Sequence, residues 1–199
     1  MAGILPAQPV SFGVKAGVPF SDFVGSGAGS TPGFSATGFS NRYIVGAAME
    51  VHLPKRLSVE ADVLYRHVTY NGVFFYPLVG TTLDHTRMGL LEIPMLVKYR
   101  FAGRVCPFVD GGAAIDRVVG LRNSYVNIAA FGSPVYTGRN STPVQLSNPT
   151  TPGVVAGGGI EARAGVMRIS PELRYTRWTS AHFLFSSQNQ VDFLLGITF

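Results

Sequence analysis

The 199-residue chain has few charged residues and no long apolar run. Charged residues make up 14% of the sequence, against roughly 25% in an ordinary soluble domain, while hydrophobic residues make up 46%. A membrane-spanning helix needs roughly 18 consecutive apolar residues, and here Glu, Asp, Arg or Gly interrupts every apolar segment. Because every backbone polar group must be satisfied within hydrocarbon, the spanning structure that remains is a closed β-barrel.

The sequence is also poor in cysteine and in the residue clusters that bind metals. Its single cysteine, Cys106, cannot form an internal disulfide, and no Cys/His cluster has the spacing of metal ligands. The sequence therefore predicts no metal and no cofactor. The first residues, MAGILPAQPV, lack a basic segment followed by a long apolar stretch, so we expect that a secretory signal has been removed.

What the sequence does contain is period-two alternation of apolar and polar residues in segments of about ten residues. The expected strands are 10–18, 42–53, 57–70, 87–101, 105–118, 152–163, 166–178 and 190–199. Long loops at about 19–41, 71–86, 119–151 and 179–189 alternate with short turns, as in bacterial outer-membrane barrels. We predict an all-β fold, an eight-stranded antiparallel up-and-down transmembrane β-barrel that forms one domain over residues 1–199.

The last expected strand indicates which face of the barrel meets lipid. Its odd-numbered positions, from Val191 to Phe199, are all apolar, whereas Asp192 lies on the other face. Carried round the barrel, this phase gathers acids and bases in one enclosed interior, where they can pair. We predict an interior charge network of Glu60, Asp62, Glu92, Lys98, Arg100, Glu172 and Arg174.

Two features qualify this interpretation. A soluble β-sandwich would show the same alternation with its charges in water, but apolar faces this long, ending in a terminal aromatic residue, favour the membrane barrel. Pro94, Pro107 and Pro171 each remove a hydrogen-bond donor from a strand that has no free edge. We expect these prolines to mark β-bulges beside glycine-rich neighbours.

A family resemblance is carried by the opening FGVKAGV, the hairpin LEIPMLVKYRF…VCPFVDGGAAI, the segment ISPELRYTRW and the terminal ITF. On these segments the chain resembles the outer membrane protein beta-barrel domain family of small porin-like proteins, similar in architecture to OmpX and the OmpA membrane domain. The resemblance implies the bacterial outer membrane and a C-terminal strand, ending in Phe199, that the outer-membrane assembly machinery reads. It carries location and fold rather than a particular activity.

Several functions stay open. The four histidines, His52, His67, His85 and His182, are the candidates for a lipid A-modifying enzyme, but spacing identifies no serine and acidic partners for them. A narrow porin-like channel is a second alternative, although eight strands leave room only for side chains. The bases do not cluster as in nucleic-acid-binding proteins, so we expect no nucleic acid. We predict a non-enzymatic, monomeric barrel with an envelope-structural or surface-binding role through its loops.

Strand phase also predicts a contact with lipopolysaccharide. Arg87, Arg117 and Arg177 are the odd-numbered residues nearest the long loops of their strands, so they should point outward at the membrane interface. A guanidinium there can hold phosphate with paired hydrogen bonds. The expected partners are therefore outer-membrane lipids and lipopolysaccharide, and the alternative is an ordinary solvated loop rim.

Overall fold

The computed structural model describes residues 10–23, 34–76, 80–103, 105–129, 136–141, 146–183 and 186–199. Within these residues the elements are β1 (Val10–Pro19), β2 (Phe34–His52), η2 (Pro54–Arg56), β3 (Leu57–Tyr76), β4 (Gly80–Arg100), β5 (Val105–Ala129), β6 (Tyr136–Asn140), β7 (Thr150–Ala164), β8 (Met167–Trp178) and β9 (Asn189–Thr198). In these ranges no helix is long and apolar enough to cross a membrane.

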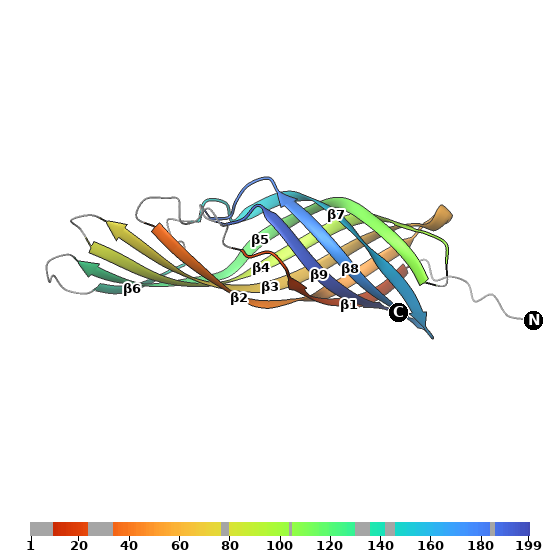
Figure 1. The fold of residues 1–199 in the computed structure, drawn as a ribbon, viewed down its shortest axis with the longest axis horizontal. Coiled ribbons are helices and arrows are strands. Elements are labelled where there is room, and N and C mark those ends of the chain that lie inside the picture. The colour runs from red at the N-terminus through yellow and green to blue at the C-terminus, as the bar shows by residue number, and fades with distance from the viewer. Residues whose placement is uncertain are drawn as a thin grey trace, which may run out of the picture.

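The strands close into a barrel, which confirms the predicted eight-stranded antiparallel fold. Neighbouring strands pair in the order β4, β3, β2, β1, β9, β8, β7 and β5, and β4 also pairs with β5. The seam between the two ends of the chain is the antiparallel β1–β9 ladder, in which Lys15 lies opposite Gly196. Figure 1 shows the strands tilted around the barrel, with the C-terminus at one end.

Strands β2 to β5 are longer than the sequence predicted. Within the expected loop 71–86, residues 71–76 and 80–86 instead continue β3 and β4 in unbroken antiparallel register up to the pair Tyr76 and Gly80. Part of the expected loop 119–151 continues β5 and adds β6 beside it, and β2 begins within the expected loop 19–41. The loop prediction was wrong here because Asn, Thr and Gly resemble loop composition, whereas pairing between neighbours satisfies the backbone of each extension.

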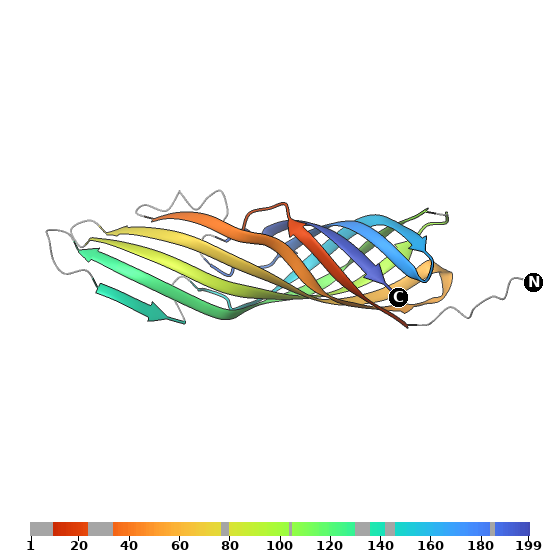
Figure 2. The same ribbon diagram turned by 90° about the horizontal axis from the view of Figure 1, so that it is seen from below.

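These extensions form a sheet that projects beyond the barrel (Figures 1 and 2). We call it the protruding sheet and define it as residues 34–40, 72–76, 80–86, 123–129 and 136–140 of β2, β3, β4, β5 and β6. The described part of β7 begins at Thr150, whose partner in β5 is Arg117. The protruding sheet therefore does not pair with β7. Strands β2 to β5, with β6 beside them, extend further outward than β7.

The prolines do not mark the expected bulges. β3 and β4 keep one register on both sides of Pro94, and β7 and β8 do so on both sides of Pro171, although the pairs at each proline are missing from those ladders. Pro107 pairs in register with Ile160. The prediction was wrong because a proline withdraws one donor and opens the ladder locally, but adds no residue to either strand.

A register shift lies instead where β5 enters the protruding sheet. Between the pairs Arg87–Arg122 and Gly89–Val119, β5 contributes one residue more than β4. Gly120 lies in this segment with a φ of 60°, a left-handed conformation that favours glycine. Because the extra residue reverses the alternation, the even positions of β5 face inward before the shift and the odd positions do so after it.

Candidate functional site

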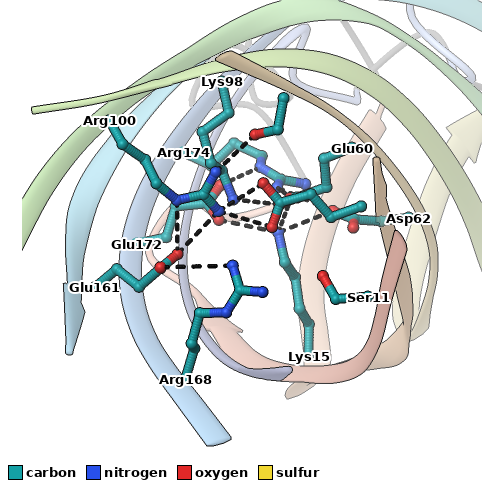
Figure 3. A network of polar contacts seen from close by, with 12 residues as sticks. Ser11, Lys15, Glu60, Asp62, Lys98, Arg100, Glu161, Arg168, Glu172 and Arg174 are labelled. Carbon is teal, nitrogen blue, oxygen red and sulfur yellow. Dashed lines mark hydrogen bonds and ion pairs between the residues drawn. The ribbon is translucent and has the colours of Figure 1, made fainter. Parts of the chain in front are cut away.

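The barrel interior is filled with paired charges, and Lys15 of β1 lies at their centre (Figure 3). Its Nζ lies 3.1 Å from Oδ2 of Asp62 and 3.0 Å from Oε2 of Glu172, and it also contacts Glu60. Arg174 donates from Nε to Glu172 over 2.6 Å and from Nη2 to Asp62 over 3.0 Å. We call these residues, with Lys98, the central cluster; it ties β1 to β3 and β8 across the interior.

Lys98 brings β4 into the central cluster. Its ammonium group donates to Glu60 and stands 4.6 Å from the centre of the Phe108 ring, a cation–π contact. The side chains of Lys98 and Glu60 are each 2% exposed. The central cluster is therefore almost completely shielded from water.

A second cluster lies toward the short-turn end, around Arg100. The guanidinium donates to Glu161 over 2.9 Å, to Glu50 over 2.7 Å and to the Ser58 hydroxyl over 2.7 Å. Arg168 lies 3.8 Å from the second oxygen of Glu161, as Figure 3 shows. Arg100, expected in one network with Glu60, thus pairs with different acids.

A third cluster lies toward the protruding sheet. Arg66 donates to Asp192 over 2.8 Å, and the amide nitrogen of Gln190 donates to Glu92 over 3.0 Å and to Asp192 over 2.6 Å. Glu92 is therefore held by Gln190, whereas Lys15 pairs with Glu60, Asp62 and Glu172. The structure places the seven predicted network residues in three successive clusters rather than in one.

Sequence reasoning missed the residue that joins the central cluster. Lys15 is not among the predicted network residues, because it is a single cation in the glycine-rich segment FGVKAGV. The position of Lys15 could have indicated its role. An inward-facing base in the first strand is expected to pair with inward-facing acids of the strands across the barrel. Which strands those are depends on the closed barrel.

The connection between β8 and β9 enters the outer end of the barrel. Phe183 is fully buried and packs edge-on against Tyr70 and Phe23, with ring centres 5.5 and 6.1 Å away. Its neighbour Leu146 forms a β-bridge with it. This segment therefore covers the interior charges with an apolar layer that also includes Met88, Leu90 and Val68.

His182 anchors this covering segment. Its Nε2 lies 3.0 Å from the Asp116 carboxylate, and its Nδ1 lies 2.7 Å from the carbonyl oxygen of Asn148. Both oxygens are hydrogen-bond acceptors, so this geometry favours a charged ring that donates from both nitrogens. Burial opposes this charge, but the hydrogen bond and the negative charge of Asp116 raise the pKa of His182 above its ordinary value. His182 falls within the expected loop 179–189, and the sequence does not predict this contact because Asp116 is 66 residues away.

The outer rim carries the three arginines predicted to meet lipopolysaccharide. Arg87 in β4, Arg117 in β5 and Arg177 in β8 are all exposed. Arg177 donates to Asn189 over 2.6 Å, and Arg87 donates to His85 over 3.0 Å. His85 thus lies in β4 rather than in a loop. A further exposed base, Arg122, lies opposite Arg87 in the β4–β5 ladder, in a segment that the sequence did not predict as strand.

The outer surface of the barrel is apolar. Phe193 and Leu195 are 38% and 41% exposed, whereas Asp192 is 1% exposed, which confirms the predicted strand phase. An apolar exterior around a charged, enclosed interior is the arrangement of a transmembrane β-barrel of the bacterial outer membrane. The chain belongs to the outer membrane protein beta-barrel domain family, whose model matches residues 6–177. The predicted location in the bacterial outer membrane is thereby confirmed.

Solved structures similar to this chain include other small outer-membrane proteins. OprG of Pseudomonas aeruginosa is 12% identical with a TM-score of 0.46, covering 96% of this chain and 94% of that one. Neisserial surface protein A is 9% identical with a TM-score of 0.45, covering 96% of each. Ail of Yersinia pestis, in complex with the heparin analogue sucrose octasulfate, is 9% identical with a TM-score of 0.44. The match covers 96% of this chain and 100% of that one. A search of curated proteins finds no match.

Proposed function

We propose that this protein is a non-enzymatic, surface-binding barrel that contacts lipopolysaccharide through its outer rim and binds a partner outside the cell through the protruding sheet. The observation that carries the proposal is the contrast between a filled interior and a sheet that extends beyond it (Figure 2). An interior occupied by side chains has little room for transport, whereas a projecting sheet offers new surface.

The filled interior supports this proposal over a channel. Lys15 and Lys98 are each 2% exposed, Arg174 is 1% exposed, and Phe183 covers the outer end of the barrel with no exposed surface. Side chains that solvent barely reaches do not line a water-filled pore. We therefore expect conductance far below that of a general porin.

The geometry of two of the four histidines, His182 and His67, supports a non-enzymatic role. A general base needs a free nitrogen lone pair, and each ring nitrogen of His182 lies within hydrogen-bond distance of an oxygen acceptor. His67, on the lipid side, lies 3.4 Å from the Thr69 hydroxyl. Neither arrangement supplies the nucleophile, base and acid of a hydrolase.

The basic rim can be tested by removing its charge. Changing Arg87, Arg117 and Arg177 to Gln should weaken binding of lipopolysaccharide by the purified barrel, because each loses a donor pair for phosphate. The matched control changes the exposed bases of the opposite end, Lys55, Arg56 and Arg163, to Gln and removes the same three charges.

The loss should be confined to the rim variant and should shrink at high salt, where charge is screened. Folded mobility on gels should stay unchanged in both variants. Equal binding by the rim variant and the control at low salt would refute the rim contact.

The protruding sheet can be tested by shortening it in register. Gly72 and Asp84 are partners in the β3–β4 ladder, so residues 73–83 can be replaced by a two-residue Asn-Gly turn that suits a hairpin. Bacteria that display this shortened barrel should adhere less well to host-cell surfaces than those with the full-length barrel. Undiminished adhesion, with the shortened barrel present at the surface in equal amount, would refute the binding role.

A further inference from the structure

The protruding sheet has an inner face that continues the barrel interior and differs from it in chemistry. On this face the paired residues Thr82 and Asn127 of β4 and β5 lie one step further out than the pair Asp84 and Tyr125. β3 places Phe74 opposite Thr82. Aromatic rings and small polar groups therefore alternate across this face, whereas the barrel interior contains paired charges.

Two amides on this face are held in a fixed orientation. The hydroxyl of Thr82 donates to Oδ1 of Asn127 over 2.8 Å, and the hydroxyl of Thr86 donates to Oδ1 of Asn123 over 3.0 Å. Each bond fixes the orientation of its amide through the oxygen, and the nitrogen of the same amide carries two N–H donors. The inner face thus presents oriented donors to a ligand.

One aromatic ring lies flat across a neighbouring strand. A Cβ atom built on Gly138 of β6 would lie 2.3 Å from the phenol carbon and oxygen of Tyr125, so glycine is the residue that makes room for this ring. Tyr76, further out on the same face, is 51% exposed. These rings offer planar apolar surfaces beside the amide donors.

The face is hollowed and almost uncharged. Two adjoining hollows of about 300 Å³ each share Tyr76, Thr82 and Asn127 in their walls. Among the described residues that line them, Asp84 is the charged one, and none is Lys or Arg. A sulfated or phosphorylated ligand would need bases, and the described residues that line the two hollows supply none.

We propose that the inner face of the protruding sheet binds a neutral oligosaccharide displayed on a surface opposite the bacterium. Pyranose rings have one apolar C–H face, which stacks on an aromatic ring, and a rim of hydroxyls, which accept from amide N–H groups. Tyr76 and Tyr125 supply the stacking surfaces, and the half-buried Asn127 supplies the donors. This inference rests on the proposed surface-binding function and names its ligand class.

The position of the inner face indicates whether the saccharide belongs to the cell's own lipopolysaccharide or to another surface. Lipopolysaccharide of the cell's own membrane stands outside the barrel wall, where the rim arginines Arg87 and Arg122 project from β4 and β5. Asn123 follows Arg122 directly and lies on the opposite face of the same strand. A saccharide that reaches the inner face therefore approaches from beyond the cell surface.

The test is an array of neutral, sialylated and sulfated oligosaccharides, with purified lipopolysaccharide as a further arm, probed with the full-length barrel in detergent. Affinity for the strongest neutral oligosaccharide is then measured for paired variants. Tyr76→Ala removes a ring of the inner face, and Phe75→Ala removes the adjacent ring of the outer face, which is 57% exposed. Asn127→Ala and Val126→Ala form a second pair of the same design.

We expect Tyr76→Ala and Asn127→Ala each to weaken binding about tenfold, the effect of losing one stacked ring or one positioned hydrogen bond. Phe75→Ala and Val126→Ala should change binding less than about twofold, and 0.5 M salt should leave it unchanged because no charge pair forms. Folded gel mobility of all four variants excludes misfolding as the cause.

The other outcomes overturn the inference. Binding of no neutral oligosaccharide, equal losses on the two faces, preference for sulfated chains with salt sensitivity, or binding of lipopolysaccharide through Tyr76 would each contradict it. If no saccharide binds but the barrel shortened by residues 73–83 still loses adhesion, the inference fails and the proposed function stands. If adhesion survives that shortening, the proposed function itself fails.

Discussion

Replacing Lys15 by Met should destabilise the barrel strongly, because this residue holds three acids together. Its ammonium group lies 3.1 Å from Asp62 and 3.0 Å from Glu172, and it also pairs with Glu60. Met fills a similar volume without charge, so the substitution leaves the acids in place with Arg174 and Lys98 as their remaining partners. The packing changes little, and the loss is chiefly electrostatic.

The magnitude follows from burial. Side chains of Lys15 and its three partners are between 0% and 2% exposed, and removing one partner of a buried ion pair costs about 3–5 kcal/mol. For a chain of this length each kcal/mol shifts the unfolding temperature by about 2–4 °C, which gives a decrease of roughly 6–20 °C. The same change at the exposed turn residue, Lys55→Met, should shift the unfolding temperature by less than about 2 °C.

The assay is the loss of folded gel mobility on heating in detergent, followed for Lys15→Met, Lys55→Met and the double variant Lys15→Met/Glu60→Gln. The double variant removes one base and one acid together, so it should recover part of the lost stability through a favourable coupling energy. If Lys15→Met unfolds at the same temperature as Lys55→Met, the central cluster does not stabilise the fold and the reasoning is refuted.

Three further predictions follow from the same structure. Glu172→Leu should lower the unfolding temperature in detergent, since it leaves Arg174 and Lys15 without an acceptor at 2.6 and 3.0 Å; an unchanged temperature would count against the central cluster. The covering segment 179–183 should be best protected from hydrogen exchange below pH 6.5 and should lose protection as pH rises through the raised pKa of His182, because folding favours the charged ring. His182→Gln should abolish this pH dependence, and its persistence would show that another group titrates. Phe199→Ala should reduce the amount of barrel assembled in the outer membrane but not refolding of the purified chain in detergent, where no machinery reads the terminal strand; equal assembly would exclude that role for Phe199.

The sequence alone determined the barrel and its two faces. Period-two alternation in β8 and β9 places Glu172 and Asp192 on one side and Phe193 and Leu195 on the other, whatever strands lie beside them. Low charge without a long apolar run then leaves a barrel as the spanning structure. These features are local, so a single chain read in order was sufficient to predict them.

The tertiary structure decided which charges meet and where the wall ends. Lys15 reaches Glu172, 157 residues away, because β1 and β9 close the barrel and bring β8 near β1. His182 meets Asp116 because the β8–β9 connection turns inward. The protruding sheet depends on pairing between neighbours, since residues with loop-like composition become strand when an adjacent strand accepts their hydrogen bonds. The single extra residue of β5 beside Gly120 reverses which positions of the strand face inward, so that Asn123 and Tyr125 point inward. The alternation of residues along β5 does not predict this reversal.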